Sequence, residues 1–189
     1  MKLGFLLGTF DPMHIGHIAT ISTVLSEHKC DKVFVVPTVH NPTKDMPLAD
    51  FKQRCEWIQQ LIEPFGNSVE VCKVESDLSE PYYSCFTLEK ISERYGQDDN
   101  ELFIICGTDI INSIETWRNY ETMIKDRFKY IVFSRSKNVK FDICTTEVPD
   151  VSSTKLRNLM QSNFTPYPYI PDALVSAECL EFYKDNYRI

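Results

Sequence analysis

The sequence predicts an α/β fold in which helices cover both faces of a parallel sheet, and three observations indicate it. Short apolar runs of strand length recur along the chain. Segments with the apolar spacing of helices lie between most of them. Two of the runs end in a glycine followed by polar residues, at 8–11 and 107–109, as in turns from a strand into a helix. This alternation implies right-handed crossovers and a Rossmann-like, doubly wound sheet. A length of 189 residues favours a single domain over residues 1–189.

Five apolar runs predict the long strands. Residues 3–7 and 32–37 are almost entirely apolar, which is typical of buried strands. Residues 68–74 alternate between apolar and polar side chains and predict a half-buried strand. Residues 101–106 show no such alternation, so both faces of that strand should be buried. Residues 130–135 form the fifth run, and a short strand is expected at 141–144.

The helices are predicted from spacing and from residues that start or stop a helix. Residues 18–25 predict a first helix that begins near Gly16, and residues 50–62 predict an amphipathic helix that Pro64 and Gly66 end. The later helices are expected at 85–95, from Ile110 onward, after a cap at Ser152 or Ser153, and at 172–183.

The composition excludes several classes of function. The chain has 27 acidic and 20 basic residues, a net charge of −7, which argues against a nucleic-acid polymer as the main partner. No apolar run approaches the ~20 residues of a membrane-spanning helix. None of the seven cysteines lies in a Cys-x-x-Cys pair, so a zinc or redox motif has no support. An odd number of cysteines without a signal peptide favours reduced thiols, and we expect a cytoplasmic protein.

The stretch from Gly8 to His17 is expected to carry the chemistry. It joins the first strand to the first helix, and Gly8 lets the backbone approach a ligand closely. The helix that begins near Gly16 offers N–H groups and its positive dipole end to a phosphate. His14 and His17 are three residues apart, so both imidazoles can face one point. As structural residues, His14 would cap the helix and His17 would pack in the core, but the combination with two glycines favours the phosphate site.

Two later segments follow strand ends and place polar groups at the same edge of the sheet. Lys44 lies in an irregular loop after the second strand, where α/β sheets bind ligands, although a lysine in such a loop is often simply solvated. Gly107 and Asp109 follow the run at 101–106. Asp109 is expected either to accept hydrogen bonds from a ribose or to cap the next helix.

A second strong motif lies at residues 151–157. Ser152 or Ser153 caps a helix whose first turn carries Thr154 and Arg157. N–H groups, hydroxyls and a guanidinium at one helix start would make a phosphate clamp. Taken alone the segment could be only a capped helix, and its pairing with the histidine stretch favours the clamp.

The stretch at 8–17 has the form Gly-x-Phe-x-Pro-x-His-x-Gly-His and resembles the signature of the nucleotidyltransferase superfamily with the dinucleotide-binding α/β fold. Its inner His-Ile-Gly-His also resembles the signature of class I aminoacyl-tRNA synthetases, but the chain is too short for a synthetase with an anticodon domain. Nearly the whole chain is similar to bacterial nicotinate/nicotinamide mononucleotide adenylyltransferases. Residues 41–44 stand where that family has a proline-rich loop ending in lysine, and residues 151–157 resemble its Ile-Ser-Ser-Thr-x-Ile-Arg.

The resemblance implies three groups of site residues. The catalytic residues would be His14, His17, Lys44 and Arg157. The residues expected to bind ATP are Gly8, Thr9, Phe10, Gly16, Gly107, Asp109, Ser152, Ser153 and Thr154. The residues expected to border the mononucleotide are Tyr83, Ser84, Thr87, Trp117 and Arg118, with Trp117 beside the pyridine ring. Plain helix capping by Ser84 is an equal alternative, and Trp117 would otherwise be a core residue.

The resemblance also implies a reaction, in which ATP and a pyridine mononucleotide give the dinucleotide and pyrophosphate in NAD biosynthesis. Nicotinate mononucleotide is the expected acceptor, because the bacterial relatives usually prefer it to the amide. Mg²⁺ would arrive with ATP, held by phosphates and water, so no protein metal ligands are named. Adenylyl or cytidylyl transfer to another phosphate acceptor, such as phosphopantetheine or glycerol 3-phosphate, stays open, as does a non-catalytic nucleotide-binding module. The sequence makes no prediction of oligomeric state.

Overall fold

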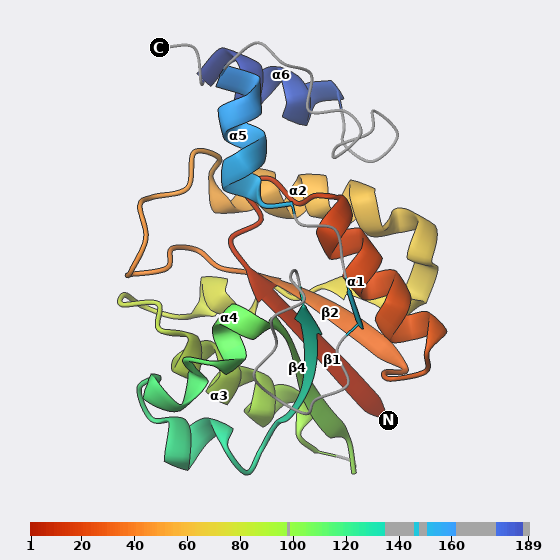
Figure 1. Ribbon diagram of the computed structural model, residues 1–189. Coiled ribbons are helices and arrows are strands. Elements are labelled where there is room, and N and C mark those ends of the chain that lie inside the picture. Colours follow the sequence, from red (N-terminus) through yellow and green to blue (C-terminus); the bar gives the residue numbers. More distant parts are fainter. Residues whose placement is uncertain (98, 135–145, 148–150, 162–176, 187–189) are drawn as a thin grey trace.

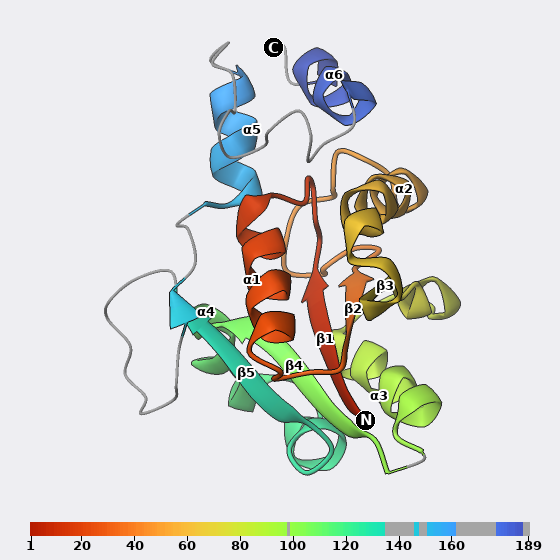
Figure 2. The same ribbon diagram turned by 90° about the vertical axis from the view of Figure 1, so that its right-hand side faces the viewer.

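The protein is built on a parallel sheet, seen in the computed structural model that describes residues 1–97, 99–134, 146–147, 151–161 and 177–186 (Figures 1 and 2). Over these residues the sheet has six strands in the order β3-β2-β1-β4-β5-β6, and every neighbouring pair is parallel. The strands are β1 Lys2–Gly8, β2 Lys32–Pro37, β3 Val69–Val71, β4 Glu101–Gly107, β5 Lys129–Ser134 and β6 Thr146–Glu147. The strand order reverses between β1 and β4, which is where doubly wound sheets bind ligands.

Helices follow β1, β2, β3, β4 and β6 along the chain. The α-helices are α1 Ile15–Ser26, α2 Phe51–Ile62, α3 Ser84–Tyr95, α4 Thr108–Ile111, α5 Ser153–Gln161 and α6 Ala177–Asn186. Shorter 3₁₀ turns lie at η1 Glu63–Ser68, η2 Val74–Asp77 and η3 Ile114–Thr116, and a π turn lies at η4 Tyr120–Ile124. Helices α5 and α6 lie at the same end of the molecule as the loops that follow β1 and β2 (Figures 1 and 2).

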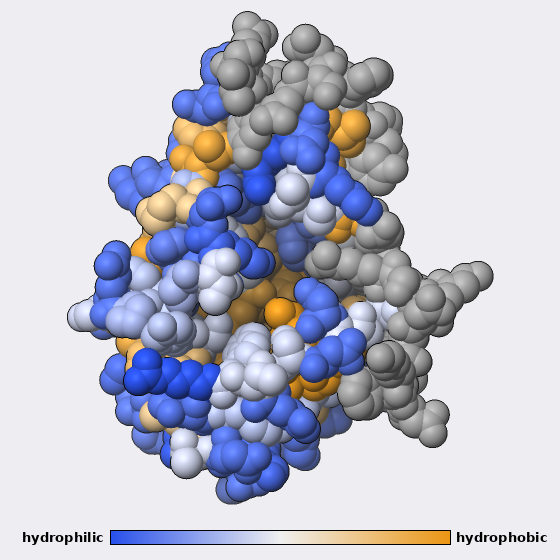
Figure 3. Space-filling view, turned by 60° about the vertical axis from the view of Figure 1, so that its left-hand side comes forward, coloured by the Kyte–Doolittle hydropathy of each residue, from blue (hydrophilic) through white to orange (hydrophobic). Residues whose placement is uncertain are grey.

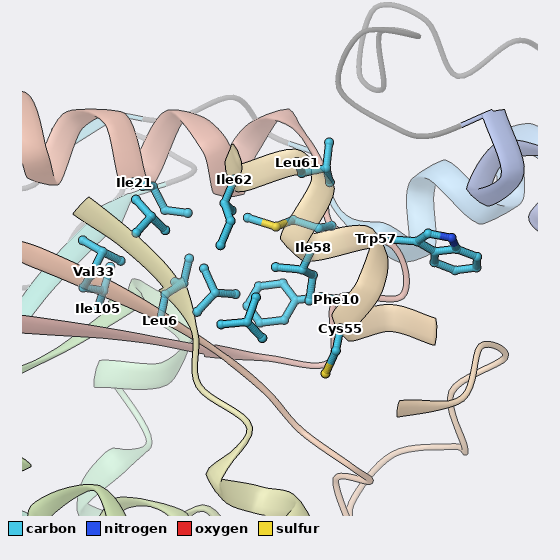
Figure 4. Packing of buried hydrophobic residues seen from close by; sticks show 14 of the residues in the cluster. Leu6, Phe10, Ile21, Val33, Cys55, Trp57, Ile58, Leu61, Ile62 and Ile105 are labelled. Carbon is cyan, nitrogen blue, oxygen red and sulfur yellow. The ribbon is translucent and has the colours of Figure 1, made fainter. Parts of the chain in front are cut away.

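Two apolar clusters form the core, one on each face of the sheet. Leu6 of β1 belongs to the cluster that α1, α2, α5 and α6 cover, and Figure 4 shows it beside Ile21, Ile58 and Ile62. The preceding residue, Phe5, belongs to the opposite cluster, with α3 and the turns after α4. Successive side chains of a strand point to opposite faces, so an apolar run without alternation fills both clusters. The predicted doubly wound α/β fold is therefore confirmed.

Several predicted boundaries need correction. Strand β3 ends at Val71 instead of residue 74, because the chain turns there and carries Glu75 into the interior. Helix α4 begins at Thr108 with Gly107 at the N-cap, so Asp109 lies in its first turn and does not cap it. Ser84 is the first residue of α3 and does not cap it either, since Tyr83 holds the N-cap position.

The end of the chain is described in part. The strand expected at 141–144 lies outside the described residues, and β6 follows at Thr146–Glu147. The last helix was expected at 172–183 and is described as Ala177–Asn186. Residues 172–176 lie outside the described part.

Candidate active site

A cavity of about 1070 Å³ opens where the strand order reverses. Its lining includes Leu6 of β1 and Ile104 and Ile105 of β4, and polar residues from the loops beyond these strands. Figure 3 shows a recess with an apolar floor and a largely hydrophilic rim. Its volume is at the upper end of the range for small-molecule sites.

Most of the predicted site residues meet at this cavity. Those in its lining are Gly8, Thr9, Phe10, His14, His17, Lys44, Gly107, Asp109, Trp117, Ser152, Ser153, Thr154 and Arg157. The predicted residues outside its lining are Gly16, Tyr83, Ser84, Thr87 and Arg118. The histidine stretch, the loop at 38–50 that carries Lys44 (the lysine loop), the turn after β4 and the start of α5 thus share one cavity, although up to 149 residues separate them along the chain.

The glycines of the histidine turn make room for neighbouring side chains. Phe10 has a positive φ of 51° and is buried, and its ring lies 3.0 Å from where a Cβ of Gly8 would be. A Cβ on Gly16 would lie 3.0 Å from Val151 and 3.1 Å from the His14 ring. Gly16 therefore lets the start of α1 pack closely against the segment that leads into α5, and Gly8 accommodates an aromatic ring of the turn itself.

The two imidazoles are stacked at the start of α1. Their ring centroids lie 3.7 Å apart, and the ring of Phe10 meets that of His17 edge-on at 4.9 Å. His14 is at the N-cap position and buried, whereas His17 is half-buried. The backbone N–H of His14 donates to Nδ1 of His17 at 3.1 Å. This bond places the proton of a neutral His17 ring on Nε2, so the ring can donate from that atom.

Helix α5 is attached to the histidine turn by its first residues. Ser152 caps the helix, since its hydroxyl accepts from the Lys155 N–H at 3.2 Å. The Ser153 hydroxyl donates to the carbonyl of Pro12 at 2.7 Å. The Arg157 guanidinium donates to the Asp11 carbonyl at 2.5 Å and to the Thr154 hydroxyl at 3.3 Å. The two motifs therefore form one structural unit.

Asp11 is a residue of this unit that the sequence reasoning left without a role. Its carboxylate is 4% exposed, yet the residue lies in the cavity lining. Its oxygens accept from the N–H groups of Leu48 at 3.0 Å and Ala49 at 3.3 Å, and from the hydroxyl of Tyr183. Oδ2 lies 3.7 Å from the Arg157 guanidinium. The sequence did contain a signal for Asp11, because this residue lies inside the stretch from Gly8 to His17.

Arg54 was also missed. It is 1% exposed, and its guanidinium donates to the carbonyls of Ala49 at 3.0 Å, Thr9 at 2.5 Å, Thr38 at 2.8 Å and Val39 at 3.1 Å. Burial lowers the pKa of Arg54 from its ordinary value. The negative charge of nearby Asp11 acts in the opposite direction and raises this pKa more than any other neighbouring group does. The sequence carried a signal, because position 54 lies on the apolar stripe of α2, three residues after Phe51 and four before Ile58.

The lysine loop is held at its ends and exposed at its tip. Arg54 and Asp11 bind its two ends, as described above. At the tip the Asn41 side chain accepts from the N–H and hydroxyl of Thr43, at 3.0 and 2.8 Å, and the Asn41 carbonyl accepts from the Lys44 N–H at 2.9 Å. Asn41 thus forms the turn at the tip, and Lys44 lies exposed on the cavity wall.

The residues expected to border the mononucleotide separate into two sets. Trp117 lies in the cavity lining and is half-buried. The exposed Arg118 lies over the ring of Tyr83 at 5.4 Å and the ring of Phe86 at 5.9 Å, outside that lining. Thr87 is fully buried, and its hydroxyl donates to Glu75 at 2.7 Å. Thr87 therefore supports the interior and is not in the cavity lining.

The described part of the chain holds neither a metal-binding cluster nor a membrane-spanning helix. Over the described residues, no cluster of three or more His, Cys, Asp or Glu side chains could hold a metal ion. In the same part of the chain, no helix is both long and apolar enough to cross a bilayer. Burial raises the pKa of the Cys106 thiol to about 12, so this cysteine of the cavity lining is a poor nucleophile.

Comparison with known proteins identifies the family. A family model described as cytidylyltransferase-like matches residues 5–159. The chain belongs to the cytidylyltransferase-like family. The match contains the histidine turn, the lysine loop and the α5 motif, but ends before α6.

Relatives within the family have similar lengths. The chain is 32% identical over 174 residues to a protein of Fusobacterium nucleatum named probable nicotinate-nucleotide adenylyltransferase, covering 86% of this chain and 89% of the relative. It is 28% identical over 181 residues to a Flavobacterium johnsoniae protein of the same name, covering 90% and 92%. A nicotinic acid mononucleotide adenylyltransferase of Plasmodium falciparum, solved with NaAD, has a TM-score of 0.71 at 15% identity, covering 96% of this chain and 93% of that one. At this identity the likeness supports the fold alone.

Proposed function

We propose that this protein transfers the adenylyl group of ATP to nicotinate mononucleotide, releasing pyrophosphate and forming the dinucleotide used in NAD biosynthesis. The observation that carries the proposal is the single cavity in which the stacked histidines, Lys44, Arg157 and Trp117 meet. The names of the relatives, which are similar over most of their length, support the same reaction. Transfer of a cytidylyl group is the second candidate, because the matching family model is described as cytidylyltransferase-like.

The inferred chemistry is a direct in-line displacement. An oxygen of the 5′-phosphate attacks the α-phosphorus, the new P–O bond forms, and the bond to the bridging oxygen breaks as pyrophosphate leaves. A phosphate monoester is already largely dianionic at pH 7, so no general base is needed. The protein contributes positioning and donors for the charge that develops. His14 and His17, aided by Lys44 and Arg157, take this role at the cavity wall.

The remaining contacts follow from the same arrangement. The turn at Gly8, Thr9 and Phe10, the start of α1 at Gly16, and the first residues of α5 lie toward the ATP side. Gly107 and Asp109 line the cavity from the turn between β4 and α4, where Asp109 is exposed and able to accept from a ribose hydroxyl. Trp117 offers a flat face to the pyridine ring. Tyr83, Ser84 and Arg118 lie outside the cavity lining, so they would contact the mononucleotide only if they moved toward the cavity when it binds.

Mg²⁺ is proposed to enter with ATP. The carboxylates in the cavity lining belong to Asp11, Asp45 and Asp109. Both carboxylate oxygens of Asp11 already accept hydrogen bonds from the protein. This donor set fits an ion that is held mainly by phosphates and water, which is usual for Mg²⁺ bound with a nucleotide. The bound ion would neutralise phosphate charge beside the residues named above.

We also propose that residues 1–189 form a single nucleotidyltransferase domain that works in the cytoplasm. The family match over residues 5–159 supports the first part. The six cysteines in the described part of the chain are free and buried, which suits a reducing compartment.

The acceptor is tested by measuring pyrophosphate release with a panel of phosphate acceptors. We expect kcat/KM for nicotinate mononucleotide to exceed that for nicotinamide mononucleotide by about tenfold or more, since polar contacts discriminate strongly between an acid and an amide. Phosphopantetheine and glycerol 3-phosphate, each with ATP and with CTP, test the second candidate. Equal values for the acid and amide would contradict the preference, and release with none of the acceptors would favour a non-catalytic module.

Replacing Arg157 with lysine is expected to raise the KM for ATP by about tenfold, because an ammonium cannot reproduce the guanidinium fork. Arg157 is 20% exposed and is held by Asp11 and Thr154 at the cavity wall. Arg157→Ala removes the charge as well, and its matched control is Lys155→Met, which removes a positive charge in the same helix turn but outside the cavity lining. Unchanged ATP affinity and turnover in Arg157→Ala would remove Arg157 from the proposed site.

A further inference from the structure

The C-terminal helix contributes a hydroxyl to the histidine turn. Tyr183 of α6 is fully buried, and its hydroxyl donates to Oδ1 of Asp11, 172 residues earlier in the chain. Its ring packs 5.7 Å from that of Trp57 on α2. Burial raises the pKa of Tyr183, and the carboxylate of Asp11 raises it further, so the hydroxyl keeps its proton and stays a donor. Tyr183 lies beyond the residues that the family model matches.

The carboxylate that receives this hydrogen bond is part of the anion site. Asp11 lies in the cavity lining, where a negative side chain would repel the phosphates of ATP unless donors surround it. Oδ1 accepts from Tyr183 and from the Ala49 N–H, and Oδ2 accepts from the Leu48 N–H. Two cations of the described residues lie near this carboxylate. The Arg157 guanidinium is 3.7 Å from Oδ2, and Arg54 is nearby but already donates to four backbone carbonyls.

Loss of the Tyr183 hydroxyl would change how the Asp11 carboxylate interacts with its remaining neighbours. Without the hydroxyl, Oδ1 retains the Ala49 N–H, whose bond at 3.3 Å is long. A buried carboxylate that lacks a donor strengthens its interaction with the nearest cation. That cation is Arg157, which already donates to the backbone carbonyl of Asp11. The guanidinium would then be drawn toward Asp11 and would bind phosphates less well.

We propose that Tyr183 is a positioning residue of the adenylyl-transfer site, which holds the Asp11 carboxylate so that Arg157 stays available to the phosphates of ATP. The assay of turnover rests on the proposed function, but the binding of ATP does not depend on which acceptor is used. Tyr183 of α6 and Arg157 of α5 are coupled through Asp11, because both contact its carboxylate.

The test is Tyr183→Phe, which removes one oxygen and keeps the ring against Trp57. We expect the Kd and the KM for ATP to rise about five- to tenfold, in the range of coupling between residues of one hydrogen-bond network. The KM for nicotinate mononucleotide should stay within about twofold, and kcat should fall less than the ATP affinity. A purely structural loss would lower the active fraction and leave both KM values unchanged.

Two control variants separate the hydroxyl from the helix. Tyr95→Phe makes the same chemical change in the opposite core cluster, where the hydroxyl lies 3.8 Å from the Cys72 sulfur. Phe182→Leu weakens the packing of α6 on Trp57 without touching Asp11. Melting temperatures of all variants show how much each change destabilises the fold. Both controls should leave the KM for ATP unchanged.

A double variant tests the route through Arg157. If Tyr183 acts through Arg157, Tyr183→Phe added to Arg157→Lys should raise the Kd for ATP by less than the product of the two single effects. A wild-type Kd for ATP in folded Tyr183→Phe would overturn the proposal, as would an equal rise in Phe182→Leu or full additivity. If the wild-type protein released no pyrophosphate with nicotinate mononucleotide, the proposed function would fail while the ATP measurements still decided the role of Tyr183.

Discussion

Replacing His17 with alanine is expected to lower kcat by ~10²-fold or more, with little change in the Kd for ATP, as when one preorganised donor is lost. The reason is the hydrogen bond from the His14 N–H to Nδ1, which leaves the proton of the neutral ring on Nε2. A donor at this position gains strength as charge develops on the phosphates, so its loss affects the transition state more than bound ATP. Single-turnover pyrophosphate release measures the chemical step.

The same substitution also removes an acceptor from the start of α1, and a second variant separates the two effects. His17→Asn keeps a side-chain oxygen for the His14 N–H but has no imidazole. It should lose as much kcat as alanine and less stability, since a helix cap is worth about 1 kcal/mol. His28→Asn, on an exposed turn with positive φ that asparagine tolerates, is the control. A kcat near the wild-type value in either His17 variant would exclude the proposed role.

Replacing Arg54 with methionine is expected to lower the melting temperature by about 10 °C or more and to abolish most activity. The change leaves four carbonyls at the base of the site without their donor, and loss of one member of a buried charge network typically costs about 3–5 kcal/mol. For a chain of this length each kcal/mol corresponds to roughly 2–4 °C. Thermal unfolding followed by circular dichroism measures the effect.

Neighbouring positions on α2 supply the comparison. Lys52→Met removes a cation whose side chain is 85% exposed and should shift the melting temperature by no more than about 2 °C, as for most surface changes. Arg54→Lys keeps the charge between Asp11 and Glu75 but cannot serve four carbonyls, so it should fall between the wild type and Arg54→Met. A stable and active Arg54→Met protein would mean that the carbonyls find other donors and that Arg54 does not hold the site together.

The sequence predicted the fold well because its strands obey local rules. Residues 3–7 and 102–106 are apolar throughout, and burial on both faces of a parallel sheet requires such runs. Glycine turns at the ends of β1 and β4 placed the site at the reversal of strand order. The boundary of β3 was harder to predict, because the alternating pattern continues to Val74 while the chain has already turned to bury Glu75.

The residues of the candidate site could be predicted from the sequence only where their type and spacing indicate a chemical role. The histidines, Lys44 and Arg157 do so. Thr87 follows the expected spacing too, but its environment is set by Glu75, which comes from a distant turn. Arg54 and Tyr183 were missed because an arginine in an amphipathic helix is usually solvated, and a tyrosine near the chain end is usually a packing residue. Their roles depend on partners 45 and 172 residues away.

The contacts of Asp11 have a consequence for the order in which the protein becomes active. Its partners lie 37, 38, 146 and 172 residues further along the chain. During synthesis Asp11 of the histidine turn precedes Arg157 and Tyr183 by 146 and 172 residues. Contacts between such distant segments form late in folding, because closing long loops costs entropy first. The histidine turn therefore gains its full set of contacts only when α5 and α6 pack against it.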